Sequence, residues 1–99
     1  MSQPDELLES LMAETPDVKR RGAEFERNGV VFAAQPDKST VELRLGAEIA
    51  DAAMNTPGTH PSSRGDAWIA LKPDNWADAD DRLEAWYRVA WRMAAKQKK

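Results

Sequence analysis

The chain of 99 residues is predicted to be a single α+β domain, a two-layer sandwich in which helices cover a small antiparallel sheet. Two observations predict this class. The middle of the chain alternates apolar and polar residues on both sides of a hairpin signal, which is typical of a sheet with one buried face. The last quarter repeats apolar residues at helical spacing. The expected order is α-β-β-β-α-β-α over residues 1–99, with residues 1–2 and 96–99 frayed.

The first expected helix covers residues 3–14. Ser2 is a suitable N-cap, and Asp5 stands three residues later, at the position of a capping-box partner. Thr15-Pro16 should end this helix, because a residue that precedes proline avoids the α conformation. The apolar residues between these limits recur at helical spacing, namely Leu7, Leu8, Leu11 and Met12.

A three-stranded meander is expected in AEFERNGVVFAAQPDKSTVELRL, residues 23–45. Asn28-Gly29 favours a two-residue turn because both residues accept positive φ, and this turn pairs Phe25 with Phe32. A second turn at PDKS pairs Gln35 with Thr40. Together these registers predict a buried face of Ala23, Phe25, Val30, Phe32, Ala34, Val41, Leu43 and Leu45. They predict an opposite face of Glu24, Glu26, Val31, Ala33, Glu42 and Arg44.

The second half of the chain predicts a short helix, a fourth strand and a long helix. Residues 47–55 read as the short helix, with Ile49 and Ala53 turned inward and Ala50 and Met54 as further candidates for that face. AWIAL (67–71) reads as the strand. Residues 77–95 read as an amphipathic helix that covers the sheet. Its buried face is expected to hold Ala79, Leu83, Trp86, Tyr87, Ala90, Trp91 and Ala94.

Composition narrows the classes of function. The chain has no Cys and one His, so thiolate metal sites and disulfides are excluded and no cofactor is predicted. No early apolar run is long enough for a signal peptide or a membrane span, and the start is acidic where a signal would be basic. We therefore expect a cytoplasmic protein without a membrane partner, a monomer by default.

The loop TPGTHPSSRGDAW (56–68) holds the single histidine. His60, Ser62, Ser63 and Asp66 are residue types of a hydrolytic triad, but they lie in one short loop and no nucleophile elbow is present, so no enzymatic activity is predicted. Prolines that stiffen a turn, with Ser and Asp that satisfy its backbone, favour a structural connector, and any function of the loop is expected to be recognition.

Trp68 has the opposite parity to Ile69 and Leu71 in the expected fourth strand. If those two residues face the helices, Trp68 faces the other side of the sheet, beside Val31 and Ala33, where it would mark a binding surface. The alternative is that Trp68 is itself buried. The expected recognition surface comprises His60, Ser62, Ser63, Arg64, Trp68 and Arg44.

The distribution of charge leaves two alternatives open. The net charge of −3 argues against avid nucleic-acid binding, yet basic residues gather at the end of the last helix. They are candidate DNA contacts or simply a solvated helix face, namely Arg88, Arg92, Lys96, Lys98 and Lys99. The acids of the first helix leave a weaker alternative, which is metal binding by Asp5, Glu6, Glu9 and Glu14.

The segments NGVVFAAQ, VELRL, IADAAMNTPGTHPSSRGDAWIALKPDNW and RLEAWYRVAWRMA resemble the MmcQ/YjbR-like family, over roughly residues 20–95. These are small bacterial proteins with a CyaY-like α+β fold. The resemblance rests on a strand containing "vFA", a Pro-containing loop, the strand start Gly65-Asp66-Ala67-Trp68 and a last helix with a central aromatic residue. It implies no catalytic residue. The family is often described as DNA-binding, and the related frataxin-type fold binds iron through acids of its first helix.

Taken together, the sequence predicts a small non-enzymatic binding module whose partner is an unknown protein or small molecule. DNA binding through the basic end of the last helix is the alternative, and metal binding by the acidic first helix is a weaker one.

Overall fold

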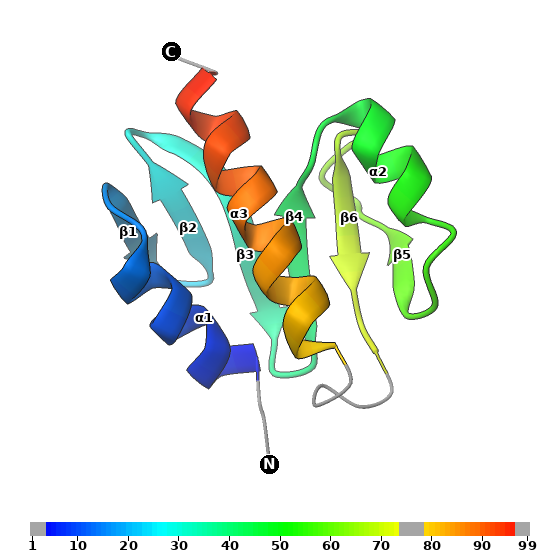
Figure 1. The fold of residues 1–99 in the computed structure, drawn as a ribbon, viewed down its shortest axis with the longest axis horizontal. Helices are drawn as coiled ribbons and strands as arrows, with labels where there is room; N and C mark the ends of the chain where they lie inside the picture. Colours follow the sequence, from blue (N-terminus) through cyan, green and yellow to red (C-terminus); the bar gives the residue numbers. More distant parts are fainter. Residues whose placement is uncertain (1–3, 74–78, 97–99) are drawn as a thin grey trace.

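The computed structural model describes residues 4–73 and 79–96. It confirms the predicted α+β class: the described residues form three helices and one six-stranded antiparallel sheet (Figure 1). The helices are α1 (Pro4–Glu14), α2 (Ala47–Ala53) and α3 (Asp80–Lys96). The strands are β1 (Val18–Arg21), β2 (Glu24–Arg27), β3 (Val30–Asp37), β4 (Thr40–Arg44), β5 (Thr59–Pro61) and β6 (Trp68–Leu71).

The strands lie in the order β1-β2-β3-β4-β6-β5, so β1 and β5 form the two edges. Neither edge strand was predicted. β1 forms a hairpin with β2 through Gly22-Ala23, and β5 lies inside the stretch expected to be a loop. The observed order is therefore α-β-β-β-β-α-β-β-α rather than α-β-β-β-α-β-α.

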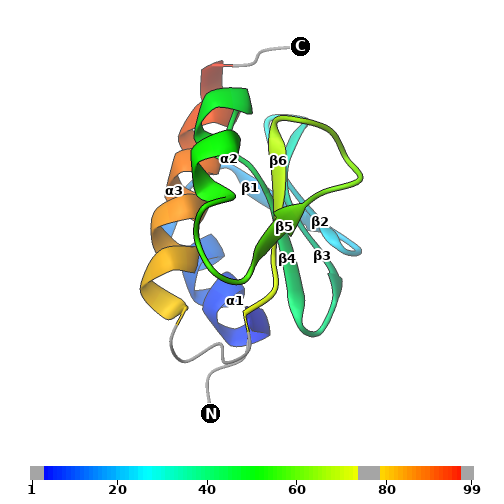
Figure 2. The same ribbon diagram turned by 90° about the vertical axis from the view of Figure 1, so that its right-hand side faces the viewer.

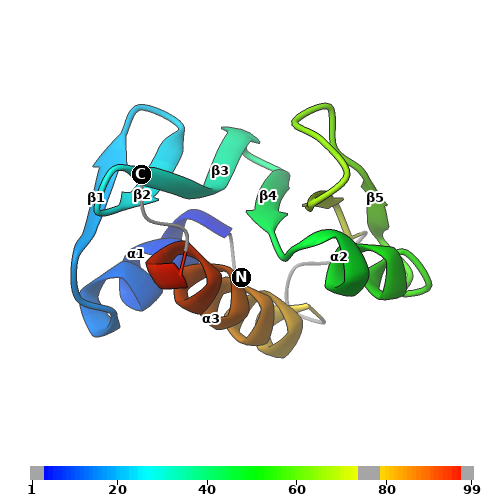
Figure 3. The same ribbon diagram turned by 90° about the horizontal axis from the view of Figure 1, so that it is seen from above.

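All three helices lie on one side of the sheet, as Figures 2 and 3 show from two directions. α3 packs across the centre of the sheet against β2, β3 and β4, while α2 packs against β6. None of the described helices lies on the opposite face of the sheet. The connection between β5 and β6 (residues 62–67, called the β5–β6 loop below) projects on that side.

The first predicted turn is confirmed. Asn28 and Gly29 have φ of 53° and 84°, and the pairs Arg27–Val30 and Glu26–Val31 follow the predicted register. The register then shifts by one residue at a β-bulge, which places Phe25 opposite Ala33 instead of Phe32. In a bulge two residues oppose one partner, and their side chains can point to the same side.

The bulge corrects the predicted faces of β3. Phe32 and Ala33 are both fully buried in the core, whereas Ala34 pairs with Glu24 and Glu42 on the open side. Ala33 and Ala34 are therefore exchanged relative to the prediction.

The second predicted turn is displaced. β3 continues to Asp37, which pairs with Thr40, and the turn residues are Lys38 and Ser39. Asp37 Oδ1 accepts hydrogen bonds from the Ser39 backbone N–H at 2.9 Å and from Ser39 Oγ at 3.1 Å. This local carboxylate bonding stabilises the tighter turn. The register shifts once more between Ala34 and Asp37, so Ala33 rather than Phe32 stands opposite Leu43.

The helices agree with the predicted ranges within a few residues. Lys96, expected to be frayed, is the last residue of α3, whereas residues 1–2 and 77–78 lie outside the described residues. The expected core residues of α3 are buried except Trp86 and Trp91, which are half-buried at its margin. On α2 the prediction for Ile49 was wrong: Ala50 and Ala53 face the sheet, and Ile49 is 42% exposed.

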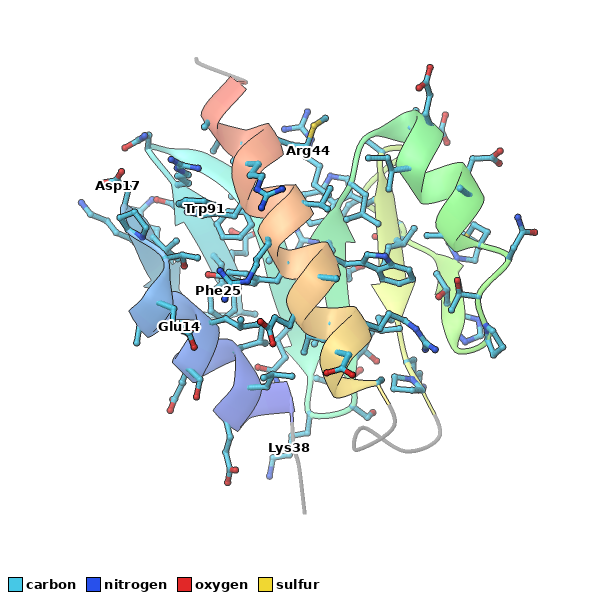
Figure 4. The ribbon with its side chains drawn as sticks, viewed as in Figure 1. Glu14, Asp17, Phe25, Lys38, Arg44 and Trp91 are labelled. Atoms are coloured by element: carbon cyan, nitrogen blue, oxygen red, sulfur yellow. The ribbon has the colours of Figure 1, made fainter. Side chains whose placement is uncertain are left out.

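Trp91 connects α3 to the first part of the chain, as Figure 4 shows near β1 and β2. Its indole N–H donates to the carbonyl of Pro16 at 3.1 Å. The guanidinium of Arg27 lies 3.8 Å from the centre of its ring and donates to its carbonyl at 2.9 Å. Trp91 thus fixes α3 to β2 and to the connection after α1.

Candidate binding site

The β5–β6 loop consists of two consecutive turns. The Gly65 N–H donates to the Ser62 carbonyl, and the Trp68 N–H donates to the Gly65 carbonyl at 3.1 Å. The Ser62 hydroxyl accepts the Arg64 N–H at 3.1 Å, and Gly65 has a φ of 137°. Because that φ strains any residue with a Cβ, glycine is required here. This compact conformation brings Ser62 and Arg64 over the open face of the sheet.

The loop is fixed to the sheet by a charged network. Arg64 Nε donates to Glu42 Oε1 at 2.8 Å and Arg64 Nη1 donates to Glu24 Oε2 at 2.9 Å. The Ser62 hydroxyl donates to the second oxygen of Glu42 at 2.7 Å. Both oxygens of the Glu42 carboxylate, whose side chain is only 10% exposed, are therefore occupied.

Ala34 makes this arrangement possible. It stands directly between Glu24 and Glu42 in the sheet, on the same face, and is fully buried. Because its side chain is a single methyl group, the guanidinium of Arg64 can span the two carboxylates on either side of it. The hydrogen bond to Glu42, followed by that to Glu24, raises the pKa of Arg64. Arg64, a predicted recognition residue, thus holds the loop in place.

Trp68 lies on the open face and is half-buried, in agreement with its predicted parity. It stands opposite Arg44 of β4, and the guanidinium of Arg64 lies 5.2 Å from the centre of its ring. Ala33, the other expected neighbour, is buried on the helix side. Arg64 covers part of the indole, so Trp68 is held in one orientation.

A pocket of about 260 Å³ lies between α2 and the β5–β6 loop. We call it the α2–loop pocket. Helix α2 contributes Ala47, Ala50, Asp51 and Met54, which lie three or four residues apart on one helix face. The other wall is formed by Pro61, Ser62, Gly65, Asp66 and Trp68.

The lining of this pocket combines an aromatic wall with negative charge. The alanines of α2 leave space, while Trp68 and the 37% exposed Met54 supply apolar surface. Asp51 and Asp66 are both exposed, and neither forms an ion pair within the described part of the chain. The sequence predicted Ser62 and Trp68 as candidates but did not predict Asp51 or Met54. Their helix was expected to be structural, and only the packing of α2 beside the loop reveals them.

The remaining predicted residues lie near this pocket but do not line it. His60 is exposed on β5, opposite Ala70 on the open face, and its imidazole makes no hydrogen bond to any residue that the structure describes. The Ser62 hydroxyl is committed to Glu42, so it is not paired with His60. Ser63 is exposed, and Arg44 is half-buried beside Trp68.

Two other depressions are less suited to a ligand. One of about 560 Å³ is lined by Asp17, Lys19, Glu26, Asn28 and Gly29, and therefore by no apolar side chain. Another, of about 290 Å³, lies around Arg20, Gln35 and Lys38 and has no aromatic wall. The α2–loop pocket is distinguished by its half-buried indole, because ligand sites combine apolar walls with a few polar groups.

The basic end of α3 is partly neutralised. Arg88 lies 2.9 Å from Glu14 and 3.4 Å from Glu84, so its charge is shared with two carboxylates. Arg92 is exposed and forms no ion pair with another described residue, whereas Lys98 and Lys99 lie outside the described ranges. Glu14 is labelled in Figure 4 at the end of α1, next to α3.

The acidic first helix is paired in a similar way. Glu9 lies 4.0 Å from Arg20, and Glu14 is bound to Arg88. Within residues 4–73 and 79–96, no group of three or more His, Asp or Glu side chains is arranged to hold a metal ion. In the same residues, no helix combines the length and the apolar character needed to cross a membrane.

Comparison of the chain with models of protein families, with curated proteins and with solved structures finds no match. The resemblance to the MmcQ/YjbR-like family therefore stays a prediction, and the candidate site depends on its geometry alone.

Proposed function

We propose that this chain is a small non-enzymatic binding module and that its binding site is the α2–loop pocket. The observation that carries the proposal is the position of Trp68. Its indole is half-buried at the wall of a pocket, and the β5–β6 loop beside it is held rigidly through Arg64 and Glu42. A preformed wall of this kind reduces the entropy that is lost when a ligand binds.

The surroundings of the pocket support binding more than catalysis. The chain's single histidine lies outside the lining, and the Ser62 hydroxyl donates to Glu42, whose other carboxylate oxygen accepts from Arg64. Because this ion pair fixes the loop to the sheet, we interpret the contact of Ser62 with Glu42 as structural. The described features are those of a recognition site: apolar walls, two carboxylates and a fixed loop.

The proposal is tested by amide and indole NMR signals of the labelled protein during titration with small fragments of three kinds, namely cationic, anionic and neutral aromatic. We expect at least one class to shift the Trp68 indole N–H and the amides of Ser62, Gly65 and Asp51. An Ala47→Phe variant should lose these shifts, because the larger side chain fills the pocket from the exposed first turn of α2. If no class shifts these signals, the pocket is not a binding site.

DNA binding through Arg88, Arg92, Lys96, Lys98 and Lys99 remains the alternative proposal. It is tested in the same experiment with a short mixed-sequence duplex at two salt concentrations. Contacts to phosphates weaken steeply as salt rises, so salt-sensitive shifts confined to the end of α3 would favour this alternative. Because Glu14 and Glu84 already neutralise Arg88, we expect such shifts to be small.

A further inference from the structure

We infer that the α2–loop pocket takes a small organic cation, a guanidinium or ammonium group on a short apolar stem. This inference rests on the proposed function, and it adds the chemical class of the ligand. The argument uses the charge of the lining, its aromatic wall and its size.

The charge of the pocket is negative on two opposite sides. Asp51 projects from α2 and Asp66 from the β5–β6 loop, and both line the same pocket. Neither carboxylate forms an ion pair with a Lys or Arg side chain of the described residues, so both are open to a ligand. Two carboxylates from separate elements can hold one cationic group between them, because each guanidinium or ammonium group offers several N–H donors.

Arg64, the cation of the β5–β6 loop, does not compensate this charge. Arg64 donates to Glu42 and to Glu24, and both of these carboxylates lie on the sheet outside the pocket lining. The positive charge of Arg64 is therefore used within the protein, and it offers little attraction to an anion. This arrangement favours a cation over a phosphate or a carboxylate.

The apolar lining matches the stem of such a ligand. An indole attracts cations to its face, and a thioether adapts to irregular alkyl groups. Trp68 of β6 and Met54 of α2 both line the pocket and supply these two groups. The volume of about 260 Å³ is below the usual range for a drug-sized ligand and is suited to a group the size of an arginine side chain.

A metal ion is a poorer occupant of the same site. The lining contains two carboxylates and no histidine, and a hard cation normally takes six or more oxygen ligands. An organic cation needs fewer oxygen ligands, because its stem gains contact with Trp68 and Met54.

The test is an NMR titration of the full chain with n-butylguanidinium, with n-butylurea as an uncharged analogue of the same shape and with butyrate as an anion. We expect n-butylguanidinium to shift the Trp68 indole N–H and to bind about tenfold more tightly than n-butylurea, since only the guanidinium can form ion pairs with the two carboxylates. Butyrate should not bind.

Variants without the charges of Asp51 and Asp66 test whether these carboxylates attract the cation. Asp51→Asn combined with Asp66→Asn should weaken n-butylguanidinium binding about five- to tenfold and leave n-butylurea unchanged. The matched control is Glu6→Gln combined with Glu48→Gln, which removes the same charge from exposed positions outside the pocket and should change neither affinity. The amide spectrum of each variant shows whether the fold is kept.

The outcomes separate the inference from the proposed function. Equal binding of n-butylguanidinium and n-butylurea at Trp68, or preference for butyrate, overturns the cation inference and keeps the pocket as a binding site. No binding of any of the three at this pocket overturns both. A capped Gly-Arg-Gly peptide that binds more tightly than n-butylguanidinium supports the inference and assigns the cation to a protein partner. A peptide that binds no more tightly also supports it and assigns the cation to a free small molecule.

Discussion

At the scale of the residue, Tyr87 shows how this small core accommodates a polar atom. Its ring is fully buried and meets Phe32 edge-on, with ring centres 5.3 Å apart. Its hydroxyl lies 3.0 Å from Thr15 Oγ1, which donates its only hydrogen to the Leu11 carbonyl at 2.8 Å. Tyr87 must therefore be the donor to Thr15. Burial, the largest effect, raises the pKa of Tyr87 because the phenolate would lose its solvation.

This environment predicts an alkaline loss of stability. A tyrosine in the unfolded chain has a pKa of about 10, below the raised pKa of Tyr87, so the unfolded state loses this proton first as the pH rises. The contribution of Tyr87 is fully present below about pH 10 and is lost as the pH rises through the raised pKa. Tyr87→Phe should cost about 1–2 kcal/mol at neutral pH and lack this part of the alkaline decline. Urea unfolding of both proteins at neutral and alkaline pH measures the difference.

Phenolate absorbance provides an independent check, because Tyr87 is the only tyrosine in the chain. It should ionise together with unfolding. Ionisation near the pH of free tyrosine while the protein stays folded would contradict the buried donor.

At the scale of the element, the bulge between β2 and β3 decides which residues of β3 enter the core. Beyond the bulge, Ala33 replaces Phe32 as the partner of Phe25, and Ala34 turns to the open face between Glu24 and Glu42. Without this shift in register, Ala34 would face α3. The guanidinium of Arg64 would then lack the small side chain over which it reaches both Glu24 and Glu42. The charged network of the open face therefore depends on one extra residue in a single strand.

Substitutions on β3 distinguish the bulged register from the regular one. Ala33→Asn should destabilise the protein by about 3 kcal/mol, because it places an amide without partners in a filled core. Val31→Asn on the open face of the same strand should cost about 1 kcal/mol or less. Urea unfolding of the two variants gives the comparison. Equal costs, or a larger cost for Val31→Asn, would mean that Ala33 does not face the core.

Several elements could be read from the sequence because their signals are local. Asn28-Gly29 defines its own turn, and the apolar spacing of residues 79–94 defines α3. β1 was missed because VKRR does not alternate, and β5 because it is short and ends in a proline. The bulge has no local signal either. Its effect is to bring Ala33 into the core together with Phe25 and Phe32.

The residues of the candidate site likewise differ in whether the sequence alone reveals them. Trp68 and Ser62 were predicted from the parity of a strand and the composition of a loop, and both line the pocket. Asp51 and Met54 belong to a helix that meets this loop only in the folded chain. The contacts of Arg64 could not be predicted, because its partners Glu24 and Glu42 are far from it in sequence.

At the scale of the whole molecule, the sheet is stabilised unequally from its centre to its edges. β3 and β4 are bonded on both sides to neighbouring strands and are covered by α3, whereas β1 and β5 each have one neighbour. The α2–loop pocket lies at the β5 end, where α2 is short and the loop is attached through Arg64. The proposed site is therefore placed at the less stable side of the sheet, as is usual for binding regions.

Native-state hydrogen exchange should reproduce this gradient. We expect the amides of β3 and β4 to exchange last, at the free energy of global unfolding, and those of β1 and β5 to exchange through local opening. Addition of n-butylguanidinium should slow exchange at residues 59–68 more than elsewhere. If β5 amides were protected as long as those of β4, the pocket would belong to the rigid core.

The composition of the two edge strands bears on how the protein behaves at high concentration. β1 exposes Lys19, Arg20 and Arg21 in succession, so a second copy laid against it would bring like charges together. β5 has three residues and ends at Pro61, which lacks the N–H that a new strand would need. Both edges of this sheet therefore resist the addition of a foreign strand, the step by which exposed sheets begin to form fibrils.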